Sequence, residues 1–319
     1  MNTYSELKTW RNSVIKKVST DHYKLNSFHD ELMIKSIRIA IRKVESEWGT
    51  PPTRFAFIVM GSAGRFEQLK WSDQDHGIIF EGSINQPYYK LLGAEISKAL
   101  TEVGYEPCDG KVMASNVQWC KSIEEWKEQI EKWLNKEKWE TLRNFSIFFD
   151  SRVLIGEADF LRDLKRGAFR LLQENPHLYF RLYENVAKLP KPLGVFGQFL
   201  TEQRGEFAGM INIKENIVFP YVNSLRLLAY IEEIYTPSTL ERFESLSPSF
   251  DNILKYKSSF QSLQNFRIKA SEKAVSYSKI HHIDIKKLKG SEKNELKMIA
   301  NNARRLFYET KKIIEDRCR

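Results

Sequence analysis

The chain has 319 residues, of which 42% are hydrophobic and 29% are charged, with a formal net charge of +9 at pH 7. It is long enough for two domains with separate cores, and it contains no apolar run near the ~20 residues of a membrane helix, so we expect no membrane span. A polar N-terminus and only three cysteines, in no metal-ligand spacing, predict a protein of the reducing cytoplasm without a signal peptide.

Residues 1–50 are predicted to form two helices, because apolar side chains recur at helical spacing in both halves of the segment. Asp21 and His22 lie in the polar break between them, and His29 follows seven residues after His22. A metal role is open to both histidines, but we favour solvated side chains near helix ends. Gly49 and the following Thr-Pro-Pro end the second helix.

An apolar run at residues 55–60 predicts a buried strand that stops at small residues, Gly61, Ser62, Ala63 and Gly64. Small residues let backbone N–H groups turn towards an anion, so Gly61, Ser62 and Gly64 are candidates for phosphate binding. Arg65 should begin a short helix whose N-terminus faces the same point. Its guanidinium could bind a phosphate or pair with an acid in the turn.

Residues 72–77 lead into a second apolar strand at residues 78–80. Because residues two apart in an extended segment point to the same side, Asp73 and Asp75 should face the glycine turn together. Two neighbouring carboxylates repel each other unless a cation lies between them, and Mg²⁺ prefers oxygen ligands. His76 should face the opposite side, which favours packing over a role as general base. The pattern therefore predicts a Mg-nucleotide site.

This stretch also carries a family resemblance. G-S-A-G-R-F-E-Q at residues 61–68, followed by S-D-Q-D at residues 72–75, resembles the signature of the DUF294 nucleotidyltransferases. These are relatives of the PII-uridylyltransferase catalytic domain in the DNA polymerase β-like superfamily. The resemblance implies an enzyme with two Mg²⁺ ions, replaceable by Mn²⁺, that moves a nucleoside monophosphate from an NTP to a hydroxyl group and releases pyrophosphate.

Two helices are expected after the second strand, with a family-like stretch between them. An amphipathic helix is predicted over residues 88–103, and a tryptophan-rich helix with a core role over residues 119–134. Between them, residues 106–116 resemble a Cys-Pro-Gly-x-Met-Ala-x-Asn stretch of the family, with Asp109 where a proline is more typical.

A third carboxylate is expected at Asp150, at the end of a predicted apolar strand over residues 145–150. Asp150 and Arg152 resemble the F-D-x-R motif of the family. In polymerase β-like catalysis, such a carboxylate ligates the metal and helps to deprotonate the attacking hydroxyl. The alternatives are an Asp150–Arg152 surface pair and Asp109 as the third carboxylate.

Helical periodicity is almost continuous from residue 157 to the end, with one short strand suggested near residues 195–199. We therefore predict an α+β chain, in which a small mixed β-sheet nucleotidyltransferase domain with flanking helices precedes an all-α helical bundle. The predicted divisions are N-terminal helices at 1–50, a catalytic domain at 51–156 and a substrate-binding domain at 157–319.

Two basic residues of the bundle lie in family-like motifs. Lys214 ends an I-N-I-K sequence that resembles I-D-I-K, and Arg226 lies in a P-x-V-x-x-x-R-x-L-A-like helix. Charged groups among apolar residues are costly unless they are paired or placed at a site. Lys214 and Arg226 could contact nucleotide phosphates or form ion pairs with the catalytic domain.

Three other function classes compete with a transferase. A nucleotide-binding regulatory module would keep the predicted Mg-nucleotide site but would not catalyse nucleotidyl transfer. A nucleic-acid-binding protein would need a continuous basic patch with exposed aromatics, which makes this class less favoured. A phosphotransferase would share the phosphate-binding turn, but no P-loop or kinase motif is present. The hydroxyl acceptor is open, and a regulatory protein is one candidate.

Overall fold

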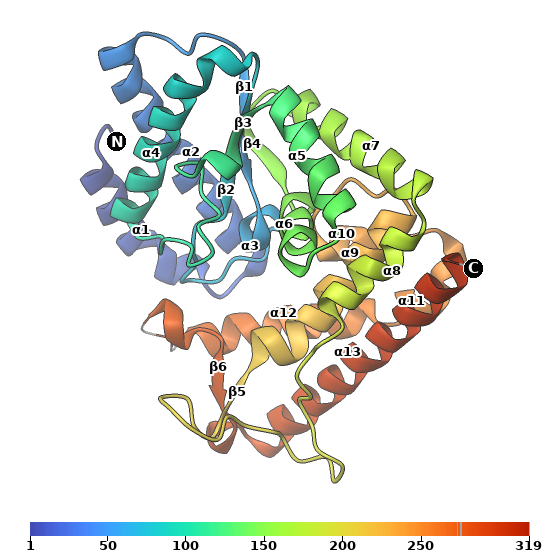
Figure 1. Ribbon diagram of the computed structural model, residues 1–319. Helices are drawn as coiled ribbons and strands as arrows, with labels where there is room; N and C mark the ends of the chain where they lie inside the picture. Colours follow the sequence, from blue (N-terminus) through green and yellow to red (C-terminus); the bar gives the residue numbers. More distant parts are fainter. Residues whose placement is uncertain (273, 275, 319) are drawn as a thin grey trace. The chain divides into compact units, whose positions relative to one another are not determined.

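The computed structural model describes residues 1–272, 274 and 276–318, and it divides into two compact units, Met1–Leu171 and Leu172–Arg319 (Figure 1). The division falls within helix α7 (Ala158–Glu174), whereas the sequence placed the boundary at residue 157. The segments 1–50 and 51–156 both lie in the first unit. Within the described residues, every helix is too short or too polar to cross a membrane.

The N-terminal segment forms two helices, as predicted. These are α1 (Tyr4–Val18) and α2 (His22–Trp48), whose first turns are capped by the side chains of Thr3 and Asp21. The predicted amphipathic helix is α4 (Gln86–Val103), which ends at Gly104 in the left-handed conformation. Leucine, isoleucine and aromatic side chains of the three helices form one core with the sheet.

The first unit is built on a mixed four-stranded sheet in the order β3-β2-β1-β4. Strand β1 pairs antiparallel with β2 and β4, and β2 pairs parallel with β3. Helices α1, α2 and α4 cover one face, and α5 and α6 lie on the other (Figure 1). The bounds are β1 Phe55–Val59, β2 His76–Phe80, β3 Cys120–Ser122, β4 Arg152–Gly156, α5 Ile123–Lys136 and α6 Trp139–Phe149, with short 3-10 turns at Ser83–Asn85 and Val117–Trp119.

Three local predictions were wrong. The apolar run at residues 145–150 is not a strand but the end of helix α6, and Asp150 follows its last turn. The short helix expected from Arg65 onwards is instead α3 (Gly61–Gly64), the glycine turn itself. The tryptophan-rich helix begins at Ile123, where Ser122 forms a capping box with Glu125, so Trp119 lies before the helix. Trp119, Trp126 and Trp133 are all buried, as predicted.

The second unit is mainly helical, as predicted, but it also contains a small antiparallel sheet that the sequence did not suggest. The strand suggested near residues 195–199 is only an isolated bridge between Leu193 and Phe199. The elements are α8 His177–Val186, β5 Met210–Asn212, the π-helix η3 Lys214–Val218, α9 Phe219–Ile231, α10 Thr239–Ser245, α11 Asp251–Leu254, α12 Lys257–Ser271, β6 His282–Asp284 and α13 Gly290–Arg317, with 3-10 turns at Pro248–Phe250, Tyr277–Lys279 and Ile285–Lys287.

Candidate active site

Asp73 and Asp75 lie in the extended segment between α3 and β2. Both side chains are half-buried, whereas the intervening Gln74 and the following His76 are buried. The two carboxylates therefore share one side of the segment, as the alternation predicted. Oxygen atoms of Asp73 and Asp75 and the sulfur of Cys108 lie within 4.8 Å of one another. These three side chains form a group that could hold a metal ion.

The buried side of the same segment is fixed by hydrogen bonds. His76 Nδ1 accepts from the backbone N–H of Ala114 over 3.1 Å, so Nε2 carries the proton and donates to Gln74 Oε1 over 3.0 Å. Gln74 in turn donates to Thr101 Oγ1 over 2.9 Å. Burial lowers the pKa of His76 to about 3, which keeps the ring neutral. The prediction that His76 is a packing residue is confirmed.

The glycine turn lies directly beside the acid pair. The backbone N–H of Met60 donates to the carbonyl of Asp75 over 2.8 Å. Gly61 has a φ of +56°, and a Cβ atom there would lie 2.1 Å from Asp75 Oδ2. Gly61 is therefore required both by its backbone conformation and by the close carboxylate. Ser62 is half-buried in the same turn.

Gly64 has a packing role in the structure. Its N–H donates to the carbonyl of Met60 over 2.9 Å, so this donor is already engaged. A Cβ atom at Gly64 would lie 1.9 Å from the carbonyl oxygen of Asp150. The absence of a side chain therefore allows α3 to pack closely against the end of α6.

Arg65, Glu67 and Asp150 form a buried cluster. Arg65 Nη1 lies 2.7 Å from Asp150 Oδ2, and Arg65 Nε lies 3.0 Å from Glu67 Oε2. Burial alone would lower the pKa of Arg65, but the charges of Glu67 and Asp150 raise it above its usual value. The pairing favours the alternative in which Arg65 braces the turn. Among the described residues, the group of possible metal ligands does not include Asp150.

Arg152 supports the turn from another direction. Its Nη2 lies 2.6 Å from Asp30 Oδ1 on α2 and donates to the carbonyl of Ala63 over 3.0 Å. The two charged residues of the F-D-x-R-like motif thus both hold α3: Asp150 through Arg65, and Arg152 through Ala63. The structure shows no Asp150–Arg152 surface pair, because Asp150 is fully buried.

Cys108 is a member of the possible ligand group that the sequence did not reveal, and Arg143 lies near it. Burial, followed by the charge of Asp75, raises the pKa of the Cys108 thiol to about 12. A Cβ atom on Gly110 would lie 3.4 Å from Arg143 Nη2 and 3.6 Å from Cys108 Sγ. Arg143, an exposed residue of α6, therefore lies close to Gly110, as Cys108 does. Asp109, the reserve third carboxylate, is exposed in the same turn.

The connection from α3 to the acid pair is held by the N-terminal helices. Three consecutive residues of this loop are bound by side chains of α1 and α2. These bonds join Asn26 Oδ1 to the N–H of Gln68 over 2.8 Å, His29 Nε2 to the carbonyl of Leu69 over 3.1 Å, and Arg11 Nη2 to the carbonyl of Lys70 over 3.2 Å. The expectation of a solvated His29 was wrong, because this contact buries the ring completely.

Lys214 and Arg226 both belong to the second unit. Lys214 is the first residue of the π-helix and is half-buried. Burial, and then the charge of Lys214, lowers the pKa of His281 to about 2. Arg226 is buried in α9 and donates to Asn223 Oδ1 over 2.8 Å.

Comparison with known proteins places the chain in a family. Residues 11–140 match the family model described as "Putative nucleotidyltransferase DUF294", and residues 176–311 match the "Putative nucleotidyltransferase substrate binding domain". The chain belongs to the DUF294 family. A comparison of this DUF294 protein with curated proteins found no match. The glycine turn and acid pair lie within the first match, and Asp150 lies outside both.

Proposed function

We propose that this DUF294 protein is a Mg²⁺-dependent nucleotidyltransferase, similar to PII-uridylyltransferase. It would move a nucleoside monophosphate from an NTP to a hydroxyl acceptor in the cytoplasm and release pyrophosphate. The observation that carries the proposal is the position of Asp73 and Asp75 beside the Gly61 turn, within the part of the chain matched to a nucleotidyltransferase family. Family membership alone supports only nucleotidyl transfer in general.

The donor set fits a hard divalent ion. Asp73 and Asp75 offer carboxylate oxygens, which Mg²⁺ and Mn²⁺ prefer. The thiol of Cys108 stays protonated near neutral pH, because its pKa is raised to about 12, and a neutral thiol is a poor ligand for such ions. When bound, one or two ions would neutralise charge on the attacking and leaving oxygens.

The chain's own residues would orient the reactants. We propose that backbone N–H groups near Gly61 and the hydroxyl of Ser62, at the short helix α3, bind phosphate oxygens. Arg65 is already paired with Asp150, so we propose Arg143 as the phosphate-binding arginine beside the acids. Lys214 and Arg226 remain proposed nucleotide contacts of the substrate-binding domain.

Asp150 and Asp109 are the two candidates for the third carboxylate. Asp150 is buried and paired with Arg65, so we propose that it supports the turn instead of ligating metal. Asp109 is exposed and adjoins Cys108 in the chain, which makes it the better candidate for the acceptor side. If Asp109 acts on the acceptor side, Asp109→Asn should lose transfer while it stays folded. If Asp150 supports the turn, Asp150→Asn should lose stability as well as transfer.

Label transfer tests the reaction type. The full-length protein is incubated with Mg²⁺, cell lysate and each NTP in turn, labelled at either the α- or the γ-phosphate. We expect an acceptor labelled from the α-phosphate of one NTP, with labelled pyrophosphate from the γ-position. Label from the γ-phosphate alone would show a phosphotransferase, and NTP binding without transfer would show a regulatory module.

Variants assign the reaction to the site. Asp73→Asn and Asp75→Asn are expected to lower transfer by at least 100-fold while remaining folded, because each is only half-buried. Asp159→Asn, an exposed acid on α7, is the matched control and should be unaffected. Transfer that persists in the Asp73→Asn, Asp75→Asn double variant contradicts the proposal.

A further inference from the structure

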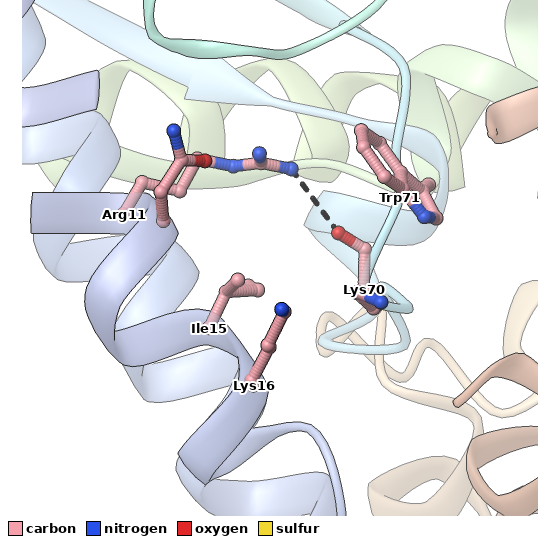
Figure 2. Close-up of a pocket in the computed structure, with 6 residues that line it drawn as sticks. Arg11, Ile15, Lys16, Lys70 and Trp71 are labelled. Atoms are coloured by element: carbon pink, nitrogen blue, oxygen red, sulfur yellow. Dashed lines mark hydrogen bonds between the residues drawn. The ribbon is translucent and has the colours of Figure 1, made fainter. Parts of the chain in front are cut away.

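A cavity lies in the first unit, between α1 and the loop that precedes the acid pair (Figure 2). Its volume is about 270 Å³. The walls come from two segments that are far apart in the sequence, and they combine cationic, polar and apolar side chains. The lining residues are Arg11, Asn12, Ile15 and Lys16 of α1, with Lys70 and Trp71 of the loop.

The cavity is strongly cationic. Arg11, Lys16 and Lys70 bring three positive charges to it, and in the described part of the chain no carboxylate pairs with any of them. Three cations without an acid repel one another, and a buried cation without a counter-ion costs free energy. An anion in the cavity would relieve both effects.

Arg11 is the buried and hydrogen-bonded cation of this cavity. Its side chain is only 4% exposed, and its Nη2 donates to the carbonyl of Lys70 over 3.2 Å. The guanidinium carbon lies 5.3 Å from the ring centroid of Trp71 and 6.0 Å from that of Tyr105, which fixes its plane. In Figure 2 the guanidinium extends across the cavity from α1 towards Lys70.

One donor of this guanidinium is unused. Arg11 Nε is buried and has no hydrogen-bond partner. Buried N–H groups are almost always satisfied, so the unused Nε donor shows that Arg11 is not fully paired within the fold. Burial also lowers the pKa of Arg11, which is the expected effect on a cation that lacks a carboxylate partner.

We propose that this cavity binds a small ligand that carries a phosphate group, in addition to any nucleotide held at the acid pair. A phosphate offers several acceptor oxygens and up to two negative charges, which matches the Arg11 fork and two lysines better than a single carboxylate does. Ile15 and Trp71 provide apolar wall for an organic remainder. The volume excludes a large ligand.

The position of the cavity separates this inference from the proposed transferase activity. Its loop wall, Lys70 and Trp71, immediately precedes Ser72 and Asp73, yet none of the six lining residues belongs to the acid pair. Binding can therefore be measured with or without nucleotidyl transfer, and failure of either claim leaves the other standing.

Calorimetric titration of the full-length protein tests the proposal. The titrations use the Asp73→Asn, Asp75→Asn variant in EDTA, so that no metal-dependent binding occurs at the acid pair. The probes are inorganic phosphate, pyrophosphate and AMP. We expect saturable binding of at least one probe. Phosphate binding would show that the phosphate group suffices, whereas binding of AMP alone would show that the organic part is needed.

Charge-removing variants locate the bound probe. Lys16→Gln with Lys70→Gln should weaken binding at least 10-fold, and so should Arg11→Gln. Lys17→Gln is the matched control, since Lys17 is an exposed neighbour outside the lining, and it should change affinity less than twofold. If Arg11→Gln fails to fold, the lysine double variant decides. Absence of binding by all three probes, or unchanged affinity in the double variant, overturns the proposal.

Discussion

Arg65 Nη1 lies 2.7 Å from Asp150 Oδ2, and both side chains are buried, at 8% and 0% exposure. Arg65 follows α3 and Asp150 follows α6, so this ion pair joins the ends of two helices beneath the glycine turn. Through this ion pair Asp150 supports the turn, so its removal should lower the free energy of unfolding.

Removing the Asp150 charge should destabilise the fold strongly. Asp150→Ala leaves the buried Arg65 with one partner fewer, and breaking a buried pair typically costs about 3–5 kcal/mol. Urea unfolding should show a loss near that range. The control Asp163→Asn, whose partner Arg166 is exposed, should lose about 1 kcal/mol or less. Normal stability combined with weaker Mn²⁺ binding in Asp150→Ala would instead make Asp150 a metal ligand.

Gly61 should tolerate no side chain. In Gly61→Ala the new Cβ would meet Asp75 Oδ2 at 2.1 Å, and the φ of +56° is unfavourable for alanine by about 1 kcal/mol. We expect at least a 10-fold loss of nucleotidyl transfer together with lower stability. Gly167→Ala in α7 is the contrast, because its Cβ meets nothing within 4 Å, and it should raise stability by about 0.5–1 kcal/mol. Full activity of Gly61→Ala would show that the turn does not adjoin the working site.

Cys108 should matter for soft ions only. Because its thiol is protonated near neutral pH, Cys108→Ser is expected to change Mn²⁺ affinity less than threefold. Cd²⁺ can displace the thiol proton, so the same variant should weaken Cd²⁺ binding at least 10-fold. Parallel titrations with the two ions give the comparison. Equal losses for both ions would make Cys108 a general ligand.

Stability should fall in mild acid because of His29. Burial lowers the pKa of His29 to about 3, below the ordinary value near 6.5, so the unfolded chain binds the proton first as pH falls. This histidine alone should cost about 2 kcal/mol between pH 7 and pH 5. In His29→Gln the amide can still donate to the carbonyl of Leu69. The loss of unfolding free energy between pH 7 and pH 5 should therefore be smaller by about 2 kcal/mol in this variant. An identical pH dependence in both proteins would show that the pKa of His29 is the same in the folded and the unfolded chain.

The sequence predicted the parts of the site that depend on local pattern. Two-residue alternation correctly separated the half-buried Asp73 and Asp75 from the buried Gln74 and His76. The strand before Gly61 was also predictable, because a short apolar run bounded by small residues favours a buried strand.

The error at Asp150 has a physical cause. Four of the five residues from Phe145 to Phe149 are apolar, because α6 is largely buried, and a short apolar run does not distinguish strand from helix. Extending the window back to Leu142 shows apolar residues three and four apart, which is helical spacing. That longer window would have indicated the helix.

Other site residues depend on contacts between distant segments. Cys108 joins the acids because Glu106 forms a bridge with Asp73, and nothing in either local sequence specifies that pairing. Arg11 and His29 reach the loop from two helices that lie 40 or more positions earlier. Their roles are visible only once the chain is folded.

The central claim is that Asp73 and Asp75 hold the divalent ion, and Mn²⁺ titration followed by electron paramagnetic resonance tests it most directly. The account predicts saturable binding to the full-length protein, weakened at least 10-fold in Asp73→Asn and in Asp75→Asn, and unchanged in Asp159→Asn. Mn²⁺ binding of normal affinity in the folded Asp73→Asn, Asp75→Asn double variant would contradict the account.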